Sequence, residues 1–227
     1  MSRLAWHFLH PGSRLRTGEA APPDGEWLKY DGPVVPCESG LHASERAIDA
    51  LRYAPFEPEV VLCRVELAGT IVEHGDPVDK LTASERRILW RLDGETTDRV
   101  LREFARWSAS QVLHLWDAPQ VVRDYLSAGD EALREAAGGA AKDALRAAAG
   151  AAAWSAAWAA AEVAEAAAAA WAAAGASAWA ARAVAEAATD AAAWASRATT
   201  WASKAAARDA QNTELERLLS EACEARS

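Results

Sequence analysis

The segment from Ala151 to Gly175 reads AAAWSAAWAAAEVAEAAAAAWAAAG and lies within a longer alanine-rich stretch, Ala140 to Ala207. Of the 68 residues in that stretch, 40 are alanine and six are tryptophan. Alanine loses no side-chain entropy when it enters a helix, and no proline follows Pro119. We therefore predict that this stretch is helical.

An internal repeat runs through the alanine-rich stretch. Trp158, Trp179 and Trp201 begin similar nine-residue segments, at offsets of 21 and 22 residues. Because such an offset is close to six turns of helix, equivalent side chains return to one face, and the opposite face is almost uniformly small. We expect a helical hairpin or bundle with an interaction surface formed by tryptophans, namely Trp158, Trp179, Trp194 and Trp201. Association of copies through the small-residue face is the alternative use of this stretch.

Composition divides the chain into two unlike parts. All five histidines and every proline lie at or before Pro119. We predict an α+β fold in which residues 1–95 form a small mixed domain and residues 96–227 form an all-helical region, with the Ala/Trp repeats at about 140–207. Helices are expected to start near Thr97, Pro119 and Asp130, and a closing helix should cover Asp209 to Glu224.

In the first part, the pattern of apolar residues and turn formers predicts strands and one short helix. Val60 to Leu67 is the strongest strand signal, and Gly69 should form a bulge or turn before Thr70 to Glu73. Ser44 suits the N-cap of a helix from Glu45 to Tyr53. Further strands are expected at Leu4 to Leu9 and Trp27 to Tyr30, while the pattern at Ser84 to Leu92 leaves the element type open.

Charge and cysteine content exclude several classes of protein. The formal net charge is −9, and neither part carries a basic cluster, so nucleic-acid binding is disfavoured. An acidic balance suits a basic partner as well as simple solubility. Three scattered cysteines favour a reducing compartment. No signal peptide is recognised at the start, and the longest uncharged run is too short and too weakly apolar for a membrane span. We expect a cytoplasmic protein.

Residues capable of chemistry gather around His42. The chain lacks phosphate-loop, nucleophile-elbow and common zinc motifs. His42 lies between Gly40 and the predicted helix, where a turn presents side chains to a ligand, although its ring could equally tie the turn together. We predict a ligand site of four residues, namely Gly40, His42, Ser44 and Tyr53. Two cysteines and two histidines, Cys37, His42, Cys63 and His74, have no tight metal-ligand spacing, so no metal is assigned.

The run from Trp27 to about Asp79 resembles an uncharacterised domain family of phage and bacterial proteins. That family has a C-x-x-G-[FL]-H-A signature followed by a short helix, a tyrosine and a V-E strand, and members often carry an Ala-rich tail. The residues that carry the resemblance are Cys37-Glu38-Ser39-Gly40-Leu41-His42-Ala43, Asp49 to Pro55 and Leu62 to Gly69. The resemblance implies no known activity.

The order of a turn, a helix and a strand between Gly40 and Gly69 is similar to that in poly-ADP-ribose polymerase-like transferases. Gly40 to Ala43, Ala50, Tyr53 and Val61 to Gly69 follow the order of a G-x-Y-x-A turn, a helix and a strand in that family. The similarity implies NAD as cofactor, His42 in the place of a nicotinamide-stacking tyrosine, His7 or His10 as the ribose-contacting histidine, and Glu85 as the catalytic glutamate.

From the sequence we expect a non-enzymatic phage or bacterial accessory protein that acts by binding another protein. The lack of catalytic signatures beside a repetitive, acidic helical surface motivates this expectation. An ADP-ribosyltransferase-like or NAD-binding domain is the first alternative, and a structural oligomer formed through the Ala-rich face is the second. No cofactor is expected except NAD under the first alternative.

Overall fold

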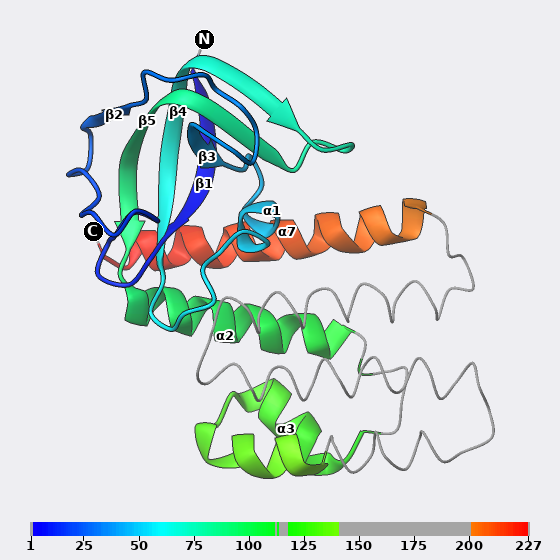
Figure 1. Ribbon diagram of the computed structural model, residues 1–227. Helices are drawn as coiled ribbons and strands as arrows, with labels where there is room; N and C mark the ends of the chain where they lie inside the picture. The colour runs from blue at the N-terminus through cyan, green and yellow to red at the C-terminus, as the bar shows by residue number, and fades with distance from the viewer. Residues whose placement is uncertain (1, 112, 114–117, 141–200, 227) are drawn as a thin grey trace. The chain divides into compact units, whose positions relative to one another are not determined.

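The computed structural model describes residues 2–111, 113, 118–140 and 201–226, and Figure 1 shows their helices and strands. The chain divides into two compact units, Met1–Arg99 with Leu219–Ser227 and Val100–Leu218, which are described separately below. Within the described ranges, no helix is both long enough and apolar enough to cross a membrane.

A five-stranded antiparallel sheet dominates the first unit (Figure 1). The strand order is β1-β4-β5-β2, and β3 also pairs with β5. The strands are β1 (Arg3–Leu9), β2 (Trp27–Lys29), β3 (Leu41–Ala43), β4 (Val61–His74) and β5 (Lys80–Leu92). The predictions of β1, β2 and the first part of β4 are confirmed, and the undecided segment at Ser84 to Leu92 belongs to a strand.

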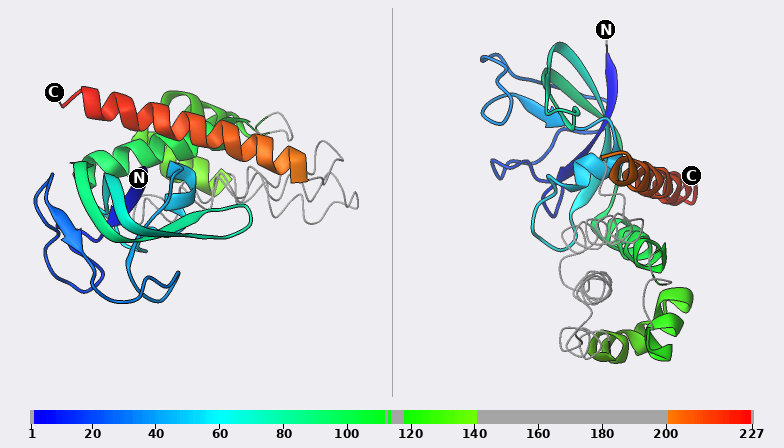
Figure 2. Two further views of the ribbon diagram at one scale, coloured as in Figure 1. Left: turned by 90° about the horizontal axis from the view of Figure 1, so that it is seen from above. Right: turned by 90° about the vertical axis from the view of Figure 1, so that its right-hand side faces the viewer.

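The strands β4 and β5 form a long curved hairpin, which Figure 2 shows from two further directions. Their register shifts between Arg64 and Val65 and again between Ala68 and Ile71. Gly69 lies in the second irregularity with φ of 72°, and the Ser84 hydroxyl accepts a 2.9 Å hydrogen bond from the Thr70 amide there. The predicted glycine bulge is confirmed, and bulges of this kind bend a strand and increase its twist.

The curvature brings β1 alongside the end of β3. Trp6 and Ser44 exchange two backbone hydrogen bonds, of 2.7 and 3.0 Å, and so form an isolated antiparallel bridge. The strands β1, β4, β5 and β3 therefore form a closed path of backbone hydrogen bonds. Such closure removes the unpaired edges that an open sheet would leave.

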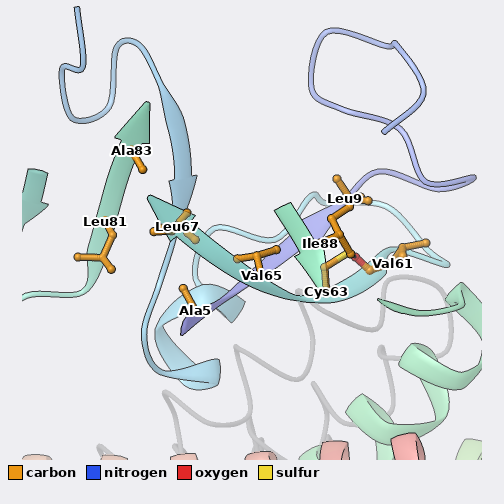
Figure 3. Close-up of a cluster of buried hydrophobic side chains, with 10 residues drawn as sticks. Ala5, Leu9, Val61, Cys63, Val65, Leu67, Leu81, Ala83 and Ile88 are labelled. Carbon is orange, nitrogen blue, oxygen red and sulfur yellow. The ribbon is translucent and has the colours of Figure 1, made fainter. Parts of the chain in front are cut away.

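The inner face of this ring of strands holds a buried apolar cluster (Figure 3). Every long strand and β3 contribute to it, and the innermost side chains are essentially inaccessible to solvent. Its members are Ala5, Leu9, Ala43, Val61, Cys63, Val65, Leu67, Leu81, Ala83 and Ile88. Burial of this apolar surface is the main favourable contribution to folding of the unit.

The region between β3 and β4 differs from the sequence-based expectation. The helix α1 covers only Ala47–Leu51, its N-cap is Arg46, and no side chain caps it. Ser44 instead pairs with Trp6, so the predicted Ser44 cap is wrong, and the expected turn after Gly40 is the strand β3. Pairing with β1 and β5 outweighs the local capping preference here. The predicted apolar face of the helix is buried as expected, and it consists of Ala47, Ile48, Ala50 and Leu51.

The described residues of the second unit are helical. The helix α2 (Gly94–Gln111) runs into it from the first unit and buries Val100, Leu101 and Phe104. Pro119 precedes α3 (Gln120–Ala128), which ends at Gly129 in the left-handed conformation, and Asp130 caps the short 3-10 helix η2 (Glu131–Leu133). The predicted starts at Pro119 and Asp130 are confirmed, whereas α2 begins at Gly94, before the predicted start near Thr97.

A long C-terminal helix, α7 (Trp201–Glu224), includes the predicted closing helix and buries Leu215 and Leu218 in the second unit. Most of the predicted Ala/Trp hairpin, including Trp158, Trp179 and Trp194, lies outside the described residues. The backbone of Trp201 starts α7.

Candidate functional site

Three of the predicted site residues line one small pocket in the first unit. His7 comes from β1, Ser44 follows β3, and Tyr53 follows α1. Lys80, the first residue of β5, lines the pocket with them, and the wall is completed by Trp6, Phe8, Ala43 and Ala50. The pocket has a volume of about 50 Å³. Sequence-distant segments meet here because the Trp6–Ser44 bridge closes the ring of strands at this point.

Tyr53 is held firmly at the mouth of the pocket. Its hydroxyl donates a 2.8 Å hydrogen bond to Asp79 Oδ2, and Arg52 Nη1 donates to the same oxygen at 2.8 Å. Lys80 Nζ lies 3.6 Å from the centroid of the Tyr53 ring, within the range of a cation–π interaction. The tyrosine nevertheless stays 44% exposed. A fixed, accessible aromatic ring beside a cation is thus the main surface feature of the site.

Burial raises the pKa of Tyr53, and together with the hydrogen bond to Asp79 it brings this pKa to about 12. The ionised phenolate would lose solvation and would face the Asp79 carboxylate. Tyr53 therefore remains a neutral hydrogen-bond donor at physiological pH.

His7 is half-buried and lies between Ala5 and Leu9 on the inner face of β1, where alternate residues of a strand share one side. Burial places its pKa well below the ordinary value of 6.5, and Arg86, His42 and His10 lower it further. A histidine with so low a pKa is neutral at pH 7, so it offers the pocket one ring donor and one ring acceptor.

His42 faces Thr82 across the β3–β5 pairing and does not line the pocket. Within the described part of the chain, His42 Nε2 and Thr82 Oγ1 are both buried without a hydrogen-bond partner. Burial lowers the pKa of His42, and the positive charges of Lys80, Arg86 and Arg16 lower it further. The imidazole thus stands in a positive electrostatic field.

Gly40, the fourth predicted site residue, has a structural position. Its φ of +105° is unfavourable for other residues, and a Cβ there would lie 2.8 Å from Thr82 Cγ2. The side chain of any other residue would collide with β5. The close packing of β3 on β5 accounts for this glycine.

The residues implied by the transferase resemblance do not converge in the structure. Glu85 lies on β5 and pairs with Lys29 at 3.6 Å, away from the pocket residues. His10 Nδ1 lies 3.2 Å from Glu57 Oε1. Only His7 of this set lines the pocket.

Asp79, Lys80 and Arg86 are important site residues that the sequence pattern did not single out. Asp79 directly precedes β5 and Lys80 is its first residue, and only the β4–β5 hairpin places them beside Tyr53. Arg86 is 5% exposed on the inner face of β5, and its inward position follows only from the pairing of β5 with β4. Among the described residues, no three metal-ligating side chains cluster, so Cys37, His42, Cys63 and His74 do not meet.

Comparison with known proteins identifies one region of the chain. Residues 13–100 match a family described as Domain of unknown function (DUF7666). This match covers the sheet from before β2 to the start of α2 and agrees with the resemblance to an uncharacterised domain family. No curated protein and no solved structure shows a significant match to the chain.

Proposed function

We propose that this protein is a non-enzymatic accessory protein of a phage or bacterium and that it acts by binding a protein partner at the Tyr53 patch. We define this patch as Tyr53, Val78 and Lys80. The observation that carries the proposal is the fixed and exposed ring of Tyr53 beside Lys80 at the mouth of a pocket.

The chemistry of the patch supports a protein partner. Val78 is 42% exposed and adjoins Asp79, the residue that anchors the Tyr53 hydroxyl. Tyrosine is enriched among residues that dominate interface energetics, because its large ring loses little conformational entropy on binding. Here the hydrogen bond to Asp79 fixes the ring before a partner arrives, which reduces the entropic cost of association.

The charge of the pocket defines the partner more closely. Lys80 is the charged residue in the pocket lining, and burial, followed by positive charges nearby, lowers the pKa of both His7 and His42. An acidic segment of the partner would complement this field. The volume of about 50 Å³ admits a small apolar side chain beside the acidic group. We therefore expect a partner segment that combines an aspartate or glutamate with a small aliphatic residue.

The pocket volume gives less support to the NAD-binding alternative. A cavity that holds one benzene molecule has a volume of about 150 Å³, and nicotinamide adds a carboxamide to a ring of that size. The pocket described here has about 50 Å³. Binding of nicotinamide would require α1 or the β4–β5 hairpin to move. The oligomer alternative concerns the Ala-rich face, which lies outside the described residues.

The test compares capture of partners by the full-length protein and three variants. Proteins bound by the wild type from host lysate are identified, and an acidic segment of the leading candidate is synthesised as a peptide. We expect Tyr53→Ala and Lys80→Glu each to weaken peptide binding by about 30-fold or more, the effect of losing a dominant interface residue. Leu89→Ala is the matched control, because Leu89 is 36% exposed on β5 and does not line the pocket.

Two results would refute the proposal. The first is equal binding of the partner by the wild type and by both patch variants. The second is NAD consumption by purified wild-type protein that His7→Ala or Glu85→Gln abolishes, because it would establish the enzymatic alternative instead. Tyr53→Phe keeps the ring but loses the hydrogen bond to Asp79, and it separates loss of contact area from loss of ring fixation.

A further inference from the structure

We propose that Arg86 forms the floor of an anion-binding site that takes a small monovalent anion of the chloride class. The site lies between β2, β5 and the segment that precedes β2. It is separate from the Tyr53 patch, and the inference does not depend on the proposed function.

The backbone register places Arg86 on the inner face of the sheet. It stands opposite Leu67 of β4 and opposite Leu28 of β2, and directly opposed residues of an antiparallel pair share a face. Leu67 belongs to the buried apolar cluster, and the Arg86 residue is 5% exposed. A guanidinium group is therefore held at the edge of an apolar core.

The protein supplies little compensation for this charge. Arg86 Nη1 donates one hydrogen bond of 2.7 Å to the main-chain oxygen of His42. A guanidinium has five N–H donors, and a buried one is normally paired with a carboxylate. Within the described residues, Arg86 has no ion pair and no second hydrogen bond. Removing a charge from water costs several kcal/mol unless a counter-charge replaces the lost solvation.

The buried position of Arg86 affects its own pKa and the pKa of two neighbouring histidines. Burial lowers the pKa of Arg86 itself to about 10. Arg86 also contributes to the low pKa of His7 and of His42. The positive potential thus extends over the inner face of the ring, where an anion would be attracted.

A small space adjoins Arg86. Arg86 lines it together with Leu15, Pro22, Glu26, Leu28 and Ile88, and its volume is about 10 Å³. That volume accommodates one particle the size of a water molecule. Four of the six lining residues are apolar and Arg86 carries the positive charge, so an anion there would be attracted by Arg86. Acetate and sulfate are too large for the space.

The carboxylate of Glu26 would compete with such an anion for Arg86. Its side chain is exposed, lines the same space and forms no ion pair with Arg86 in the described structure. Its negative charge opposes the entry of an anion, so Glu26→Gln should bind chloride more tightly than the wild type.

Thermal unfolding of the full-length protein tests the site with sodium chloride as the probe. At a chloride concentration about a hundred times the dissociation constant, we expect the Tm to rise by about 5–10 °C relative to sodium acetate at equal ionic strength. The rise should saturate, should occur at lower chloride in Glu26→Gln and should be absent in Arg86→Met. Arg64→Met is the matched control, because Arg64 lies over the Trp6 ring and away from this space.

Direct binding keeps the proposal testable if Arg86→Met fails to fold. Chloride NMR line widths should broaden with the wild type, and Leu28→Phe, which keeps Arg86 but fills the space, should abolish the broadening. The proposal is overturned if chloride and acetate give the same Tm in the wild type, or if line broadening persists in Leu28→Phe. A large destabilisation by Glu26→Gln without any chloride effect would also overturn it, because Glu26 would then be the partner of Arg86.

Discussion

Substitution of Gly40 by alanine should destabilise the first unit through two separable effects. The backbone there has a φ of +105°, and a non-glycine residue in such a conformation costs about 1–3 kcal/mol. The added Cβ would also lie 2.8 Å from Thr82 Cγ2 and 3.3 Å from the Ala83 main-chain oxygen. Thr82 is fully buried, so it cannot turn away, and overpacking of this kind costs about 1–3 kcal/mol more.

The expected loss is therefore about 2–6 kcal/mol, from a total stability of about 5–15 kcal/mol that is usual for a domain. Urea denaturation followed by far-ultraviolet circular dichroism measures this loss. Gly18→Ala is the matched control, because Gly18 has a φ of +90° and an added Cβ would meet nothing within 4 Å. Gly18→Ala should show the backbone cost alone.

A double-mutant cycle isolates the steric effect. Thr82→Ser removes the methyl group that an alanine at position 40 would strike, so Gly40→Ala should cost about 1–3 kcal/mol less in the Thr82→Ser background. The reasoning is refuted if Gly40→Ala costs the same in both backgrounds, or if it costs no more than Gly18→Ala.

Three further predictions follow from individual contacts. Asp93 Oδ1 accepts a 2.8 Å hydrogen bond from the Thr96 amide in the first turn of α2. In urea denaturation, Asp93→Ala should lower the free energy of unfolding by about 1 kcal/mol, and Asp93→Asn, which keeps an acceptor, should lower it much less. Equal losses would exclude capping by Asp93. Because the pKa of Tyr53 is raised from 10.0 to about 12, its stabilising contribution should be complete below pH 10 and be lost between pH 10 and 12. The ionisation of Tyr53 can be followed by the ultraviolet absorbance of tyrosinate, and Asp79→Asn should shift this transition to lower pH. An unchanged transition would show that Asp79 does not act on Tyr53. Cys63 is fully buried with its pKa raised to about 12, whereas Cys37 is exposed. In native protein at neutral pH, alkylation followed by peptide mapping should therefore find Cys37 modified much faster than Cys63. Comparable rates for the two cysteines would contradict the burial of Cys63.

Several elements could be predicted because their signals are local. The alternation in Val61–Leu67 and the glycine after it define the first part of β4 and its bulge, and both depend on neighbouring residues only. Pro119 and Gly129 set the ends of α3 for the same reason.

The region around His42 shows why other features could not be predicted. The strand β3 has three residues, and its partner segment on β5 follows about 40 residues later. A periodic pattern cannot be recognised over three residues, so the turn-like Gly40 dominated the sequence interpretation. Ser44 has the chemistry of an N-cap, but its backbone pairs with Trp6 of β1. A long-range contact of this kind leaves no trace in the residues next to Ser44.

The candidate site was predictable in part for a similar reason. His7, Ser44 and Tyr53 could each be singled out by residue type, and the pocket brings them together. Asp79 and Lys80 could not, because their role depends on the hairpin that places them beside Tyr53. The same holds for Arg86, whose inward position follows from its register opposite Leu67.

The sequence by itself determined the types of β1, β4, α2, α3 and α7 and the division in composition near Pro119, but not the type of β5. These properties arise from interactions between residues a few positions apart. Only the tertiary structure decided the closure of the sheet through Trp6 and Ser44, the fixation of Tyr53 by Asp79 and the burial of Arg86 without a carboxylate. Each of these depends on segments that are distant in the chain, and burial and electrostatic potential are properties of the whole fold.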